Sequence, residues 1–162
     1  MNMRVGMGFD VHAFGPGDAV VLGGVRIPWH RGVVAHSDGD VLLHALTDAL
    51  LGAAAMGDIG QHFPDTDPRW RNAASSQFVA HAVALLAADG WQVVNADLTL
   101  LAEEPRIAAH RASITTSIAG CLGLTPREVN LKATTTEKLG FIGRGEGLAA
   151  QAVVMIRSPG KT

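Results

Sequence analysis

The residues best suited to chemistry lie near the start of the chain, where Asp10 and His12 are separated by one residue. Alternate side chains of a β-strand point to the same face, so this carboxylate and imidazole would project side by side. His44 follows in a segment with helical spacing. A carboxylate with two imidazoles suits zinc, and three protein ligands with an open fourth position are typical of a catalytic zinc site. Alternatively, the Asp-x-His pair is incidental and His44 is an ordinary polar residue of an amphipathic helix.

A second cluster combines carboxylates and glycines in the loop-forming segment 57–68. Such a loop could hold the hydroxyl groups of a sugar or polyol, or bind a divalent cation through oxygen. The alternative is turn chemistry, because Asp and Gly dominate loops for backbone reasons. The candidate residues are Asp58, Ile59, Gly60, Phe63, Pro64, Asp65, Thr66 and Asp67.

A third cluster contains three consecutive threonines, 134–136, between Lys132 and Lys138, and is followed by the glycine-rich segment 143–147. Hydroxyl groups, backbone N–H groups and cationic side chains could together surround a phosphate. The order of residues is not that of a P-loop. Threonine is also a good strand former, which is the alternative explanation. These clusters together suggest a metal-assisted enzyme that acts on a phosphorylated substrate.

The elements that must position these residues alternate between strand and helix without repeated βαβ units, which predicts an α+β fold. A capping-box pattern at Ser37–Asp40 predicts a helix start at Ser37. Residues Val94, Ala96, Leu98 and Leu100 would share one face of a strand. We expect strands at 3–11, 91–101, 129–135 and 148–156, a hairpin at 20–27, helices at 37–56, 72–88 and 105–122, and a loop at 140–147. The strand at 148–156 is apolar on both faces, so it should be buried on both sides.

Composition limits the class of protein. The 162 residues are sufficient for one domain, which we expect to span 1–162. A net charge of −2 argues against a nucleic-acid or anionic membrane partner, and no apolar stretch is long enough for a membrane helix. The single cysteine, Cys121, fits a reducing compartment, so we expect a cytoplasmic protein. Hydrophobic residues make up 48% and charged residues 17%, which favours an oligomer that hides apolar surface.

Taken in order, the motifs resemble those of the 2-C-methyl-D-erythritol 2,4-cyclodiphosphate synthases of the non-mevalonate isoprenoid pathway. The resemblance covers residues 4–157 and rests on segments 8–14, 35–44, 57–67 and 132–141. It implies a chorismate-mutase-like fold with two layers, a mixed sheet and the helices that cover one face of it. It also implies a homotrimer, with sheets packed around the trimer axis and active sites between subunits.

The resemblance also implies a reaction. The family converts 4-diphosphocytidyl-2-C-methyl-D-erythritol 2-phosphate to the 2,4-cyclodiphosphate and CMP, as a cyclising phosphorus–oxygen lyase. The 2-phosphate of the substrate attacks its own β-phosphorus, so no protein nucleophile is needed. By correspondence, Asp10, His12 and His44 would hold zinc, and Glu137 would hold a second divalent cation, magnesium or manganese. His36 and Thr135 correspond to residues that stabilise the transition state.

The remaining substrate contacts are implied in the same way. Asp58, Ile59 and Gly60 would contact the ribose, and Phe63, Pro64, Asp65, Thr66 and Asp67 would lie near the erythritol. Ser37, at the expected helix N-terminus, would favour the phosphates, as would Thr134 and Thr136. The cytosine pocket would be formed by Ala102, Glu103, Glu104, Pro105, Arg106, Ile107 and Ala108. Phe141 and Arg144 would line a cavity on the trimer axis for an isoprenoid diphosphate.

Two other classes of function compete with this reading. A metal-dependent phosphatase or phosphodiesterase would use a metal-bound water and release inorganic phosphate or an open-chain product. A trimeric ligand-binding protein would keep the cavities without turnover. Some relatives carry a cytidylyltransferase domain ahead of this one, and we expect a monofunctional protein because Met1 lies close to the first motif.

Overall fold

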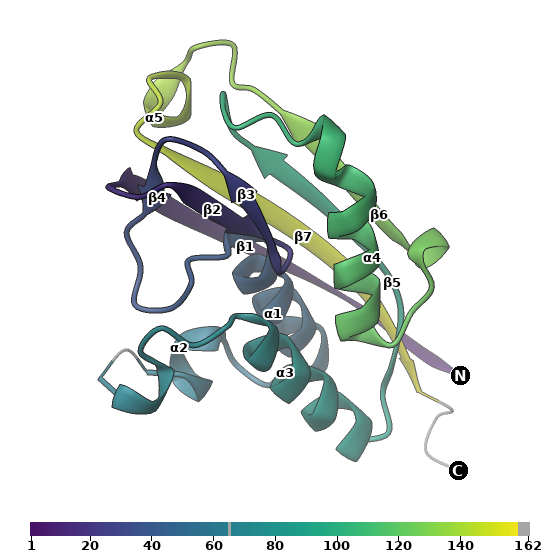
Figure 1. Cartoon of the computed structure of the whole chain (residues 1–162). Coiled ribbons are helices and arrows are strands. Elements are labelled where there is room, and N and C mark those ends of the chain that lie inside the picture. Colours follow the sequence, from purple (N-terminus) through teal and green to yellow (C-terminus); the bar gives the residue numbers. More distant parts are fainter. Residues whose placement is uncertain (65, 159–162) are drawn as a thin grey trace.

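A computed structural model of the chain describes residues 1–64 and 66–158 (Figure 1). Its centre is a five-stranded sheet in the order β4-β1-β7-β5-β6, in which only β5 and β6 pair in parallel. A separate hairpin consists of β2 and β3. The strands are β1 (Asn2–Gly15), β2 (Ala19–Leu22), β3 (Val25–Pro28), β4 (Gly32–Val33), β5 (Gln92–Leu101), β6 (Val129–Thr134) and β7 (Gly147–Ser158).

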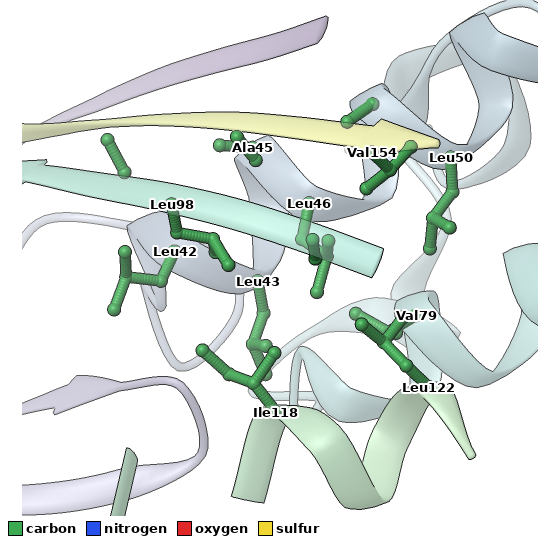
Figure 2. Close-up of a cluster of buried hydrophobic side chains, with 14 of the residues drawn as sticks. Leu42, Leu43, Ala45, Leu46, Leu50, Val79, Leu98, Ile118, Leu122 and Val154 are labelled. Atoms are coloured by element: carbon green, nitrogen blue, oxygen red, sulfur yellow. The ribbon is translucent and has the colours of Figure 1, made fainter. Parts of the chain in front are cut away.

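Helices cover one face of this sheet and form the second layer. Leu42, Leu46, Leu98, Ile118 and Val154 meet between the layers (Figure 2), each less than 2% exposed. The α+β class and the mixed sheet with helices on one face are therefore confirmed. None of the helices in the described ranges is long and apolar enough to cross a bilayer. They are α1 (Val41–Ala54), α2 (Ile59–His62), α3 (Ser76–Ala88), α4 (Arg111–Leu122) and α5 (Gly140–Gly143), with 3₁₀ turns at Pro68–Trp70, Ala108–His110 and Pro126–Glu128.

The opposite face of the sheet carries exposed apolar side chains. On β1, the even-numbered positions Gly6 and Gly8 are buried under α1, whereas Met7 and Phe9 are 57% and 53% exposed. The strand predicted at 148–156 is buried on both sides only from Leu148 to Ala150, and Val153 is 37% exposed. Within one chain the second half of the strand is covered on one face only, because one chain supplies helices to only one face, so its burial on both sides stays a prediction for an oligomer.

Two glycines of β1, Gly6 and Gly8, allow α1 to approach the sheet very closely. A Cβ atom at Gly6 would lie 2.0 Å from the carbonyl oxygen of Ala49, and one at Gly8 would lie 1.9 Å from that of Ala45. Any larger residue would therefore overlap the backbone of α1. This contact sets the height of α1, and of His44 on it, above β1.

Three helices begin later than the sequence pattern suggests. The Asp40 carboxylate caps α1 by accepting the Leu43 N–H at 3.1 Å, so Ser37–Gly39 precede the helix. The predicted start at Ser37 was wrong because Asp40 is extended, with φ −73° and ψ 92°. Similarly, α3 begins at Ser76 rather than 72, where Asn72 has a positive φ of 60°. The third, α4, begins at Arg111 rather than Pro105, after the 3₁₀ turn.

Smaller corrections concern two expected loops and one expected strand. The expected loops at 57–68 and 140–147 each contain one helical turn, α2 and α5 respectively. The alternation predicted for β5 holds for Ala96, Leu98 and Leu100, which are buried. Val94 does not continue it, because a bulge between Val93 and Asn95 interrupts the pairing of β5 with β7.

Candidate active site

The three residues predicted to be metal ligands converge. Asp10 and His12 project from β1 toward the helical layer, and His44 projects from α1 toward them. Asp10 Oδ2 lies 3.0 Å from His12 Nε2 and 3.1 Å from His44 Nδ1. His12 Nε2 and His44 Nδ1 are 3.1 Å apart. A pair within one strand and a residue of a helix therefore present three donor atoms to one point.

This triangle of atoms fits a single divalent ion. Bonds of 2.0–2.1 Å in tetrahedral geometry separate two ligand atoms by about 3.3 Å, close to the spacing observed between Asp10, His12 and His44. Lone pairs on an oxygen and two ring nitrogens repel at this distance unless a cation or a proton lies between them. The nitrogen-rich donor set suits zinc among the common ions.

Electrostatics keep the Asp10 carboxyl group in its ligand form. Burial raises its pKa, but the hydrogen bonds and positive charge that the His12 and His44 rings offer when protonated on both nitrogens outweigh this effect and hold the pKa well below its usual range. The carboxylate is therefore ionised throughout the neutral pH range and available to a cation.

A cavity of about 450 Å³ opens beside these three side chains. It includes most of the loop residues predicted to touch substrate, but not Asp58 or Pro64; Asp65 lies outside the described residues. The predicted residues that line it are Asp10, His12, His36, Ser37, His44, Ile59, Gly60, Phe63, Thr66 and Asp67. Those that the sequence analysis missed are Val34, Ala35, Pro68, Trp70, Arg71 and Phe78.

Two of the loop carboxylates have local structural partners. Asp58 Oδ1 accepts the Gln61 N–H at 3.0 Å and caps α2, as the turn-chemistry alternative expects. Asp67 Oδ2 accepts from Arg69 Nη2 at 2.6 Å. Ser37 also differs from expectation, because it precedes α1 and the N-terminus of that helix is occupied by the Asp40 carboxylate. Ser37 lines the cavity wall instead.

An aromatic wall closes one side of the cavity. Phe63 stacks at a tilt on Phe78 with ring centroids 4.5 Å apart, and Trp70 meets Phe63 edge-on at 5.0 Å. Phe78 in turn lies 5.8 Å from the His44 ring. The grouping of aromatic residues around the loop 57–68 is a sequence signal that could have identified Trp70 and Phe78. The wall would pack against an apolar part of a ligand and keep water away from the metal ligands.

A second, smaller cavity of about 190 Å³ lies at the ends of β5 and β6. The parallel pairing sets Leu101 opposite Thr134, so the segments that follow both strands meet there. Glu103 Oε1 accepts the N–H groups of Thr136 and Lys138 at 3.1 and 3.3 Å and so organises the threonine loop. The predicted residues lining this cavity are Ala102, Glu103, Pro105, Arg106, Ile107, Ala108, Thr134 and Thr135. Those predicted but absent from its lining are Glu104, Thr136 and Glu137.

The two cavities share no lining residue and are separated along the sheet. His12 pairs with Leu148, while Ala149 pairs with Leu101, which pairs with Thr134. Three strand spacings of about 4.8 Å therefore place the Thr134 end of β6 roughly 14 Å from the metal ligands. A single chain does not bring the threonine cluster beside the metal ligands.

The two residues predicted to line an axial cavity contribute to neither pocket described above. Phe141, in α5, is 41% exposed. Arg144 follows α5, and its Nε donates to Glu146 Oε1 at 2.7 Å. Both residues are therefore surface residues of the isolated chain.

Comparison with known proteins gives consistent matches over almost the whole chain. Residues 3–157 match the YgbB family. The 2-C-methyl-D-erythritol 2,4-cyclodiphosphate synthase of Pseudomonas aeruginosa (strain UCBPP-PA14) is 59% identical over 154 residues, covering 95% of this chain and 98% of that protein.

Solved structures agree with the sequence matches. The bifunctional IspDF from Campylobacter jejuni has a TM-score of 0.93 at 44% identity; the match covers 97% of this chain and 42% of that chain, so this chain spans less than half of the bifunctional protein. The CDP complex of Plasmodium falciparum IspF has a TM-score of 0.86 at 30% identity, and the match covers 98% of this chain and 98% of that chain.

Proposed function

This chain belongs to the YgbB family, and we infer that it is a cyclising synthase of the non-mevalonate isoprenoid pathway. It converts 4-diphosphocytidyl-2-C-methyl-D-erythritol 2-phosphate to 2-C-methyl-D-erythritol 2,4-cyclodiphosphate and CMP. The observation that carries this conclusion is the convergence of Asp10, His12 and His44 beside a cavity with an aromatic wall, within a chain matched over 95% of its length.

The reaction requires the protein to position the substrate, and it does not require a protein nucleophile. An oxygen of the substrate 2-phosphate bonds to the β-phosphorus, the bond from that phosphorus to the bridging oxygen breaks, and CMP leaves with the electron pair. Holding both ends of one molecule in a near-attack arrangement can remove several kcal/mol of the barrier. His36 at the wall of the larger cavity donates to phosphate oxygens, and Thr135 does so from the smaller cavity of a neighbouring chain.

Asp10, His12 and His44 would hold zinc, and Glu137 would hold magnesium or manganese. Bound divalent cations supply Lewis-acid stabilisation of charge on the phosphates. Glu137 is on the exposed threonine loop with a positive φ of 54°, away from both cavities of its own chain. Its role therefore depends on a neighbouring chain.

The aromatic wall supports cyclisation over hydrolysis. Phe63, Trp70 and Phe78 present apolar surface to the cavity that contains the metal ligands. An apolar surface against the erythritol excludes the water that a phosphatase or phosphodiesterase needs as its nucleophile. The second substrate end, a cytidine nucleotide, fits the smaller cavity, and the Plasmodium falciparum relative was solved as a CDP complex.

The protein is proposed to act as a cytoplasmic homotrimer with active sites between subunits. The exposed apolar face of β1 and β7 supports this assembly, because a monomer would leave Met3, Val5, Met7, Phe9 and Val11 in water. The separation of the two cavities in one chain supports shared sites. Packing around an axis would also bring copies of Phe141 and Arg144 together as a cavity for an isoprenoid diphosphate.

Phosphorus NMR of the reaction tests the activity directly. We expect the purified protein with zinc and magnesium to convert the substrate to a cyclic diphosphate and CMP in equal amounts. Release of inorganic phosphate or an open-chain product would instead identify a phosphatase or phosphodiesterase. Binding of CDP without turnover of the substrate would identify a ligand-binding protein.

A further inference from the structure

The outer nitrogen of His44, Nε2, contacts a buried serine, Ser75, that is not itself a candidate metal ligand. His44 Nδ1 faces Asp10 and His12, whereas its Nε2 lies 2.8 Å from Ser75 Oγ. Ser75 is completely buried and precedes α3, which packs beside α1 (Figure 1). Its side chain does not cap the helix that follows.

Ser75 is in turn held by Asp38. The Ser75 N–H donates to Asp38 Oδ2 at 3.0 Å, and the Ser75 hydroxyl contacts Asp38 Oδ1 within hydrogen-bond distance. The Asp40 N–H donates to Asp38 Oδ1 at 3.2 Å. The Asp38 carboxylate therefore receives hydrogen bonds from two backbone groups and faces the serine hydroxyl.

These contacts define the direction of each hydrogen bond. An ionised carboxylate only accepts, so the Ser75 hydroxyl gives its single proton to Asp38. The Ser75 oxygen can then only accept a hydrogen bond from His44, and the imidazole can donate one to it only if Nε2 carries a proton. With the proton on Nε2, the neutral ring has its lone pair on Nδ1, the atom that faces Asp10 and His12.

Ser37 also approaches the outer nitrogen of His44, but its setting is different. Ser37 Oγ lies 3.1 Å from His44 Nε2 and accepts the Gly39 N–H at 3.2 Å. It lines the wall of the larger cavity, whereas Ser75 does not. Among the described residues, no carboxylate hydrogen-bonds to the Ser37 hydroxyl, so its proton can be donated to a ligand in the cavity.

We propose that Asp38 and Ser75 are positioning residues that fix His44 as the Nε2–H tautomer and so prepare its Nδ1 to bind the metal. This relay rests on the proposed function, because it acts through the proposed zinc site. Groups that hydrogen-bond to the outer nitrogen of a ligating histidine commonly change metal affinity by 10–100-fold. The effect is expected on the metal affinity of the protein itself, before any substrate binds.

The first test measures zinc affinity by competition with a chromophoric chelator, using the full chain stripped of metal. Ser75→Ala should weaken zinc binding by about 10–100-fold, since the His44 proton loses its ordered acceptor. This variant keeps the backbone N–H bond to Asp38 and all of α3. Ser37→Ala is the matched control and should leave zinc affinity within about threefold of wild type.

The second test observes the tautomer by long-range proton–nitrogen NMR of the metal-free protein at a pH where His44 is neutral. Wild type should show His44 protonated on Nε2, and Ser75→Ala should show a mixture of tautomers. Asp38→Asn should shift the ring toward Nδ1–H, because an amide donating to Ser75 turns the serine proton toward the imidazole.

The outcomes separate this inference from the proposed function. Zinc affinity of Ser75→Ala within twofold of wild type would overturn the relay. A wild-type His44 protonated on Nδ1 would also overturn it, even if Ser75→Ala failed to fold. Wild-type protein that binds no zinc but shows the Nε2–H tautomer would refute the proposed metal and leave the relay standing.

Discussion

Replacing Gly8 by alanine should damage the metal site from a distance, through the packing of α1 on β1. The new Cβ would lie 1.9 Å from the carbonyl oxygen of Ala45, and ordinary contact begins at 3.4 Å. The helix must therefore move outward by about 1.5 Å or the strand must distort, and overpacking of this kind costs about 1–3 kcal/mol. Ala45 is adjacent to His44, so the displacement reaches a metal ligand.

The effect on the site follows from the same displacement. The distance between His44 Nδ1 and Asp10 Oδ2, now 3.1 Å, would grow to as much as about 4.6 Å. Two ligands of one tetrahedral zinc ion are only about 3.3 Å apart. We therefore expect Gly8→Ala to weaken zinc binding by more than about 100-fold and to lose turnover, with the free energy of unfolding reduced by about 1–3 kcal/mol.

Urea unfolding and chelator competition measure the two effects separately. Gly120→Ala is the matched control, because a Cβ at this exposed place in α4 would meet no atom within 4 Å beyond the neighbouring backbone of its own helix. It should be stabilising by about 0.5–1 kcal/mol and leave zinc affinity unchanged. A Gly8→Ala protein with wild-type zinc affinity and unfolding free energy would refute the argument that the approach of α1 to β1 sets the metal geometry.

Three further predictions concern the metal, a buried carboxyl group and the assembly. His44→Ala should abolish turnover while sedimentation velocity shows the same oligomer, whereas His30→Ala, at an exposed position, should retain activity; equal loss in both would contradict the assignment. Burial raises the pKa of Asp40 from 3.8 to about 6. The folded state therefore binds a proton at Asp40 more tightly than the unfolded state does, which adds about 3 kcal/mol to the unfolding free energy below about pH 4. This contribution is lost as the pH rises through 6. The unfolding free energy of wild type relative to Asp40→Asn should fall accordingly between pH 4 and 7, and a flat difference would disprove it. Val153→Glu should dissociate the oligomer and abolish turnover, while Gln77→Glu on α3 should do neither.

The sequence by itself determined the local chemistry of this protein. The Asp10-x-His12 spacing on a strand was sufficient to predict one shared face, and the helical spacing around His44 predicted a helix. Both depend only on the periodicity of the backbone. The motif order was also sufficient to predict the family and hence the reaction, since long motifs in a given order do not require a structure to be identified.

Tertiary structure decided where helices begin and which residues share a site. Ser37 and Asp40 both have side chains that can cap the N-terminus of a helix. Asp40 is the residue that caps α1, because its carboxylate is also held by the N–H groups of Gly23 and Gly24 from the hairpin, at 2.9 and 2.6 Å. Local sequence cannot reveal partners 16 or 17 residues away. The contact of the buried Ser75 with His44 joins positions 31 residues apart and cannot be predicted from the local sequence either.

The two cavities illustrate the same limit at a larger scale. The metal ligands and the threonine cluster belong to one expected site, yet the strand order β1-β7-β5-β6 separates them within a chain. Only the pairing of the strands reveals this separation, because it joins residues far apart in sequence, from Leu101 and Thr134, 33 residues apart, to His12 and Leu148, 136 residues apart. The sequence therefore predicted Asp10, His12 and His44 as candidate ligands of one metal ion, and the packing of α1 on β1 decided that these three side chains meet.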